Sequence, residues 1–104
     1  MRIPGYGIEV DPNTRTVWLH GEVDMASAPV LYAAAITLLT NPSADAVTID
    51  LADVTWADSA LPNTITAICD DINPTPTVRV INYDNRIKKL FLICDLGSYL
   101  DQIS

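Results

Sequence analysis

The sequence of 104 residues contains one histidine, two cysteines, four glycines and only six lysine and arginine residues. A Ser-His-Asp triad would have to use His20, and nothing in the sequence around that residue supports one. No Gly-rich phosphate loop, HExxH or CxxC motif is present, so the motifs of mononucleotide, zinc-protease and redox sites are all missing. We therefore expect no catalytic residues, no cofactor and no metal site.

A metal site formed by three aspartates is the one alternative to this expectation. Asp50, Asp53 and Asp58 are spaced three and five residues apart over a predicted strand end and the following loop. Solvated loop carboxylates are the commoner explanation of such a group, and we interpret them in that way. We likewise interpret His20 as the polar last residue of a strand, and Trp18 and Trp56 as packing residues of a strand or loop.

Positive charge is scarce, since the six basic residues stand against thirteen acidic ones and the net charge is −7. Such a field repels phosphate backbones and anionic lipids, so we expect neither a nucleic-acid partner nor membrane insertion. Four of the six basic residues fall between Arg79 and Lys89, which leaves the first three quarters of the chain acidic and suited to a basic protein partner. No window approaches the about 20 apolar residues of a membrane span, and the first residues lack a signal-peptide core, so we expect a cytoplasmic protein.

Apolar residues make up 49% of the chain and charged residues 18%, which is enough core-forming material for independent folding. Domains cluster around about 100–150 residues, so we expect one domain, 1–104. Cys69 and Cys94 each lie within an apolar run, which favours buried reduced thiols, although their spacing does not decide against a single disulfide.

The first half of the chain shows alternating and helical patterns in turn. Residues 6–10 and 15–20 read as two strands around a turn at 11–14, which predicts a hairpin. Apolar residues recur at helical spacing from Val30, and Pro29 suits a helix start, so we predict a helix over 27–40. Alternation at Val47, Ile49 and Leu51 predicts a strand over 46–51.

The second half continues the same alternation of elements. We predict a helix over 62–72 that ends before two prolines, a strand over 77–81 and a helix over 84–95 closed by Gly97. The last segment, 99–103, fits a strand or a helix. This order predicts an α/β domain with a mixed, mostly parallel sheet, an initial hairpin and helices packed over the sheet.

The stretch 53–63 links a strand to the next helix and places Ser59 near the helix N-terminus. Unpaired N–H groups and a partial positive charge tolerate an anion there, and a phosphate of about −1.5 to −2 would change the surface sharply. Asp58 or Ser59 could instead simply cap the helix, which is a frequent role of both residue types. The residues alone leave both interpretations open.

Three segments resemble the STAS family of anti-sigma-factor antagonists. Gly21-Glu22-Val23-Asp24 followed by Ser27-Ala28-Pro29 is similar to the G-E-[LIV]-D and S-A-P of that family. Residues 50–59, which read DLADVTWADS, are similar to its D-L-x-x-V-x-[FY]-x-D-S signature, and 87–91 with Leu96-Gly97 matches a late helix more loosely. The resemblance covers residues 8–100 and implies a STAS-like fold.

The resemblance also implies a function. Ser59 takes the position of the serine that a kinase-type anti-sigma factor phosphorylates and that a phosphatase resets. The unphosphorylated form then binds the anti-sigma factor and frees the sigma factor for transcription, so the domain is a substrate and binder and not an enzyme. The partner surface implied by the match comprises Glu22, Asp24, Ser27, Asp58, Ser59, Ala60 and Leu61.

The sequence departs from the family pattern directly after Ser59. Members of the family usually continue D-S-[ST]-G, whereas Ala60-Leu61-Pro62 follows here. Because proline fixes φ near about −65° and disfavours helical geometry in the residue before it, we expect the helix to begin near Pro62 and Ser59 to lie on a differently shaped loop. This departure favours the alternative function, a non-phosphorylated STAS scaffold or sensor that associates with a transporter or a larger regulatory assembly.

Overall fold

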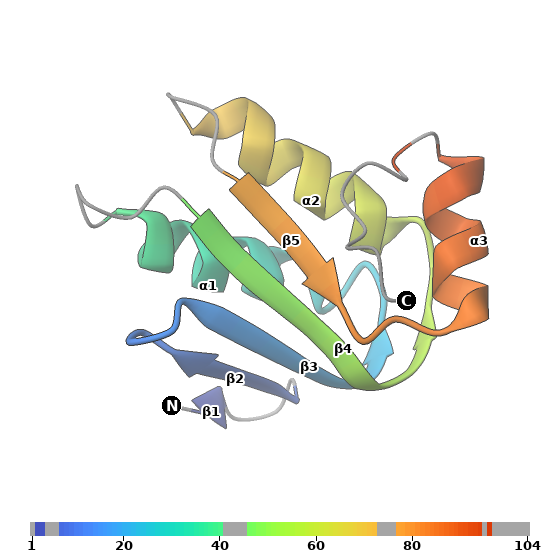
Figure 1. Cartoon of the computed structure of the whole chain (residues 1–104), viewed down its shortest axis with the longest axis horizontal. Coiled ribbons are helices and arrows are strands. Elements are labelled where there is room, and N and C mark those ends of the chain that lie inside the picture. Colours follow the sequence, from blue (N-terminus) through green and yellow to red (C-terminus); the bar gives the residue numbers. More distant parts are fainter. Residues whose placement is uncertain (1, 4–6, 41–45, 73–76, 95, 97–104) are drawn as a thin grey trace.

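The computed structural model describes residues 2–3, 7–40, 46–72, 77–94 and 96 (Figure 1). The strands are β1 (Arg2–Ile3), β2 (Ile8–Asp11), β3 (Thr16–Val23), β4 (Ala46–Ala57) and β5 (Thr77–Ile81). The helices are α1 (Ala28–Leu39), α2 (Ala60–Asp71) and α3 (Asn85–Ile93). The predicted helix end at Gly97 and the segment 99–103 lie outside the described residues.

The strands form one mixed sheet in the order β1-β2-β3-β4-β5. The β2–β3 pair is the predicted hairpin, and β3, β4 and β5 run parallel to one another. A crossover between neighbouring parallel strands is right-handed, so α1 and α2, which follow β3 and β4, lie on the same face of the sheet (Figure 1). The two-residue β1, which pairs antiparallel with β2, was not predicted because so short a segment carries no periodicity.

The core lies between the sheet and the helices. Alternate strand residues face it, including Val17, Leu19, Val47, Ile49, Leu51, Val78 and Val80. The helices cover these side chains with Leu31, Ala35, Leu61, Ile65, Ile68, Ile87 and Phe91. Both cysteines are free as expected, but only Cys69 is buried and Cys94 is half-buried. The hydrophobic periodicity of the sequence therefore marks the packed faces correctly.

The strand β4 is twice as long as the predicted 46–51. The alternation breaks at Ala52 and Asp53, which are both exposed, and Val54 then returns to the core. The pairing of β3 with β4 shifts register at this point, so the strand carries an irregularity that ends a regular period of two. The added length carries the chain to Ala57, beside the end of β3.

The predicted start of α2 near Pro62 is wrong, because the helix begins at Ala60 and Ser59 is its N-cap. Pro62 is the third helical residue, where the missing N–H has no intrahelical acceptor to lose. The Leu61 N–H donates to the Asp58 carbonyl at 3.1 Å, and the Asn63 N–H donates to the Ser59 carbonyl at 3.1 Å. Proline in the first turn therefore leaves Ser59 directly at the helix end.

Candidate functional site

Two turns meet at the carboxyl ends of β3 and β4. Residues 24–27 connect β3 to α1, and Asp58 and Ser59 connect β4 to α2. Val23 is paired with Ala57 at the ends of these parallel strands, and the Asp58 N–H donates to the Val23 carbonyl at 3.2 Å. The two segments that carry the sequence motifs therefore lie side by side in the structure.

The turn after β3 is held by a reciprocal pair of side chains. The Asp24 carboxylate accepts from the backbone N–H of Ala26 at 2.9 Å and of Ser27 at 3.2 Å. In return, the Ser27 hydroxyl accepts from the Asp24 N–H at 2.9 Å and donates to the Asp24 carbonyl at 3.2 Å. Ser27 is buried in this arrangement, so it shapes the turn and offers little surface to a partner. Met25 projects from the turn with 80% of its surface exposed.

The turn after β4 is organised by Asp58. Its carboxylate accepts from the Ala60 N–H at 2.8 Å, and its carbonyl accepts from the Leu61 N–H at 3.1 Å. Pro62 has no N–H to offer. The first donors of α2 are therefore already used by Asp58, while Ser59 is exposed and its hydroxyl has no hydrogen-bond partner among the described residues.

A solved structure of the anti-sigma factor antagonist SpoIIAA in its unphosphorylated form is similar in fold to this chain, with a TM-score of 0.79 at 15% sequence identity. The similarity covers 93% of this chain and 88% of that chain. The chain has the STAS fold. No protein-family model matches the sequence, and no curated protein matches it. The fold expected from the resemblance is thereby confirmed.

The STAS fold brings most of the predicted partner-binding residues to one place. Glu22 is exposed at the end of β3, Asp24 and Asp58 are partly exposed, and Ser59 lies between them and the first turn of α2. Leu61 does not belong to this surface, because its side chain is fully buried in the core. The motif alone does not reveal that this side chain points inward, because its direction depends on how α2 packs on the sheet.

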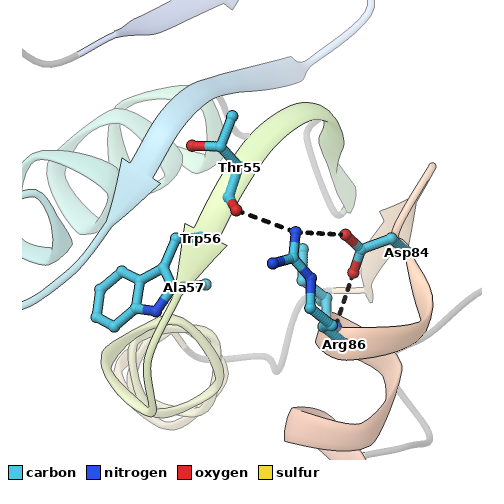
Figure 2. Close-up of a pocket in the computed structure, with 6 residues that line it drawn as sticks. Thr55, Trp56, Ala57, Asp84 and Arg86 are labelled. Carbon is cyan, nitrogen blue, oxygen red and sulfur yellow. Dashed lines mark hydrogen bonds and ion pairs between the residues drawn. The ribbon is translucent and has the colours of Figure 1, made fainter.

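A small pocket lies next to these turns, between the end of β4 and the start of α3, and has a volume of about 130 Å³ (Figure 2). Arg86 donates to the Thr55 carbonyl at 3.1 Å and approaches the Asp84 carboxylate at 3.4 Å. Asp84 caps α3 by accepting from the Ile87 N–H at 2.9 Å. That hydrogen bond, helped by Arg86, lowers the pKa of Asp84 below its ordinary value of 3.8. Arg86 thus ties α3 to the strand that leads to Ser59.

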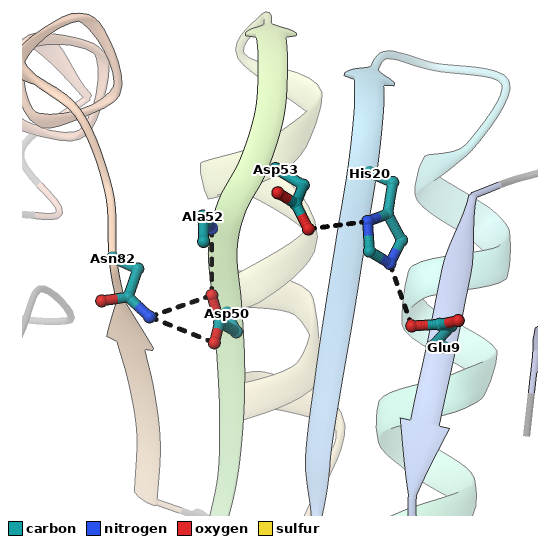
Figure 3. A network of polar contacts seen from close by, with 6 residues as sticks. All are labelled: Glu9, His20, Asp50, Ala52, Asp53 and Asn82. Atoms are coloured by element: carbon teal, nitrogen blue, oxygen red, sulfur yellow. Dashed lines mark hydrogen bonds and ion pairs between the residues drawn. The ribbon is translucent and has the colours of Figure 1, made fainter.

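The three aspartates considered for a metal site have separate roles in the STAS fold. Asp53 lies 3.1 Å from His20, and Asp50 accepts from the Asn82 side chain at 3.1 Å (Figure 3). Asp58 organises the turn before α2. His20 is not the strand end that the sequence indicated, because β3 continues to Val23. Its second ring nitrogen lies 3.1 Å from Glu9. The described residues contain no group of three or more side chains suited to a metal ion.

The surface between α1 and α2 carries a second, larger hollow that the sequence analysis missed. It is open, has a volume of about 290 Å³ and begins at Met25 and Ala60, beside Ser59. Tyr32 stands on its α1 side and donates to the Asp71 carboxylate of α2 at 2.5 Å. This hydrogen bond, together with partial desolvation and the charge of Asp71, raises the pKa of Tyr32.

Proposed function

We propose that this protein is an anti-sigma factor antagonist. Through the surface formed by Glu22, Asp24, Asp58 and Ser59, it binds an anti-sigma factor of the kinase type and so frees a sigma factor for transcription. Phosphorylation of Ser59 ends the complex, and a phosphatase restores the binding form. The domain itself acts as a substrate and binder, in the cytoplasm. None of the described helices has the length and apolar character needed to cross a membrane.

The observation that carries the proposal is the setting of Ser59 in a fold shared with SpoIIAA. Ser59 is the N-cap of α2, its side chain is exposed, and its hydroxyl has no partner in the described part of the chain. The hydroxyl is therefore accessible to a kinase without local unfolding. In the transfer, the Ser59 oxygen bonds to the γ-phosphorus of ATP, ADP leaves, and the hydroxyl proton passes to a base of the kinase.

The surroundings of Ser59 also suggest how the phosphate acts. Because Asp58 already accepts from Ala60 and Leu61, the start of α2 offers the phosphate few free donors. The phosphate would therefore stay on the surface and add about −1.5 to −2 charge beside Asp58. Burying the phosphate in the contact costs the desolvation of its charge, and its bulk disturbs the fit around the serine. Release then follows from desolvation and bulk at the interface, without a change of fold.

The charge of the surface points to basic side chains on the partner. Glu22 lies near the end of β3, Asp24 directly follows that strand and Asp58 directly precedes Ser59, in a chain of net charge −7. Opposite charge across an interface mainly raises the association rate and fixes the orientation of docking. We therefore expect the association rate to fall as salt is added, because exposed charges are screened over about 8 Å at physiological ionic strength.

Phosphorylation is tested by incubating the protein with ATP and a purified kinase-type anti-sigma factor from the same organism, followed by intact-mass measurement. We expect one phosphate on the wild type and on Thr55→Ala, a control in the same strand-to-helix segment, and none on Ser59→Ala. Phosphate on Ser59→Ala would move the switch to another residue. Binding without phosphorylation of any form would favour the alternative, a STAS scaffold or sensor.

A further inference from the structure

The helix α1 is unusual for a surface helix because it carries no charged residue. The chain has thirteen acidic and six basic residues, yet none of them lies in the described stretch Met25–Thr40. The outer positions Pro29, Ala33 and Thr37 are exposed and uncharged. Surface helices ordinarily place charged residues on the face opposite the core, and interface cores are depleted of charge. The outer face of α1 therefore has the composition of a contact surface.

The hollow of about 290 Å³ opens on this uncharged face, along the line where α1 meets α2. Its α1 side is formed by Met25, Ala28, Pro29 and Tyr32, and its α2 side by Ala60, Thr64 and Ala67. Small side chains make up most of the floor, and no charged side chain lines it. Met25, 80% exposed, forms a flexible apolar lip of the kind that adapts to an inserted side chain.

Carboxylates stand around this hollow although none lines it. Asp24 adjoins Met25 at one end, and Asp58 lies two residues before Ala60. Asp71 lies on the α2 side, where it accepts from Tyr32. An occupant that fits this arrangement is apolar at its centre and positively charged at its flanks.

We propose that this hollow, the groove between α1 and α2, binds an apolar side chain of the anti-sigma factor. That side chain is carried on a segment with lysine or arginine on either side of it. This proposal rests on the proposed function and adds a docking site to it. The groove begins at Ala60, directly after Ser59, so a segment anchored there holds the rest of the partner against the serine. Docking and phosphorylation thus share one continuous surface.

A second copy of this chain fits the groove less well than a basic partner. Each copy has a net charge of −7, so pairing of the α1 faces would bring the Asp24, Asp58 and Asp71 carboxylates of two copies together. Like charges facing one another disfavour a contact, and a basic segment gains from the same charges. The groove is therefore assigned to the anti-sigma factor.

The test uses two groove variants, Met25→Lys and Ala67→Lys, and a control, Thr77→Lys, which places the same charge on the exposed Thr77 of β5. Affinity for the purified kinase-type anti-sigma factor is measured by calorimetry without ATP, and circular dichroism verifies the fold. We expect each groove variant to weaken binding by about tenfold or more, because an apolar anchor site gains a charge that repels the basic flanks. The control is expected to bind like the wild type.

The outcomes separate the two proposals. If the wild type and both groove variants bind equally and are phosphorylated at equal rates, the groove assignment is overturned and the proposed function stands. If the wild type neither binds nor is phosphorylated, the proposed function fails and the groove assignment falls with it. A dimer of the wild type in light scattering that Met25→Lys converts to a monomer would assign the groove to a second copy, against this proposal.

Discussion

The two faces of the sheet differ in how their polar groups are used. On the face away from α1 and α2, His20 of β3 lies 3.1 Å from both Glu9 of β2 and Asp53 of β4, so polar side chains from three strands contact one another (Figure 3). On the helix side, the surface of α1 is uncharged, and the Ser59 hydroxyl has no partner among the described residues. A surface whose groups already satisfy one another has less to gain from a partner, so we place the proposed docking on the helix side.

The largest loss of stability is expected from a substitution on the buried side of the site. Leu61→Ala removes a fully buried side chain one residue into α2, and the resulting cavity is expected to cost about 3 kcal/mol of unfolding free energy. Met25→Ala is the matched control, since Met25 is 80% exposed and its loss should change stability by less than about 0.5 kcal/mol. Urea unfolding compares the two variants. Equal losses would mean that Leu61 is not the packed support of this surface.

The polar face of the sheet depends on a close backbone contact at Gly7. Its φ is +60°, and a Cβ there would lie 2.7 Å from the His20 carbonyl. Gly7→Ala is therefore expected to cost about 2 kcal/mol, from the strained φ and the clash. Gly21→Ala, with φ of +76° but nothing within 4 Å of the added Cβ, should cost only about 1 kcal/mol. Thermal unfolding gives the ranking, and a milder effect at Gly7 than at Gly21 would contradict it.

A smaller effect is expected at the cap of α3, which borders the site. Asp84→Ala removes the acceptor for the Ile87 N–H and should cost about 1 kcal/mol near neutral pH. Because folding lowers the pKa of Asp84, its contribution is complete above the ordinary value of 3.8 and disappears as the pH falls through the lower folded pKa. Urea unfolding at a series of pH values should show the two proteins converging in acid. A constant difference down to the lowest pH would contradict this origin.

The smallest loss of stability is expected from the contacts of His20 on the polar face of the sheet. His20→Ala removes contacts between side chains that are 30% to 68% exposed, so it should cost about 0.5 kcal/mol. It should also leave the affinity for the anti-sigma factor unchanged, because His20 lies on the face away from the groove. A binding loss comparable to that of Met25→Lys would end the distinction between the two faces.

Much of this fold follows from short-range pattern. The periods of two and 3.6 residues place the packed faces of β3 to β5 and of all three helices, because burial of one face is what selects those residues. The end of β4 could not be predicted from this pattern. Ala52 and Asp53 are both exposed there, at a shift of register that depends on the pairing with β3. The start of α2 was predicted too late because Pro62 disrupts a helix interior but not a first turn.

The candidate site, too, could be predicted only in part from the sequence. The motif places Ser59 at the start of α2, and the structure agrees. It does not reveal that Asp58 uses the first donors of the helix, or that Leu61 points into the core, since both depend on side-chain direction. The groove results from the packing of α1 against α2. Its one signal in the sequence is the charge-free stretch from Met25 onward, which acquires meaning only once the outer face of α1 is known.

The most direct test of the switch compares the affinity of one anti-sigma factor for the protein before and after phosphorylation at Ser59. The two forms are separated by ion exchange and titrated against the same partner without ATP. We predict that the unphosphorylated protein binds and that the phosphorylated protein binds at least about a hundredfold more weakly, because added charge and bulk stand at the centre of the contact. Equal affinities of the two forms would contradict a phosphorylation switch at Ser59.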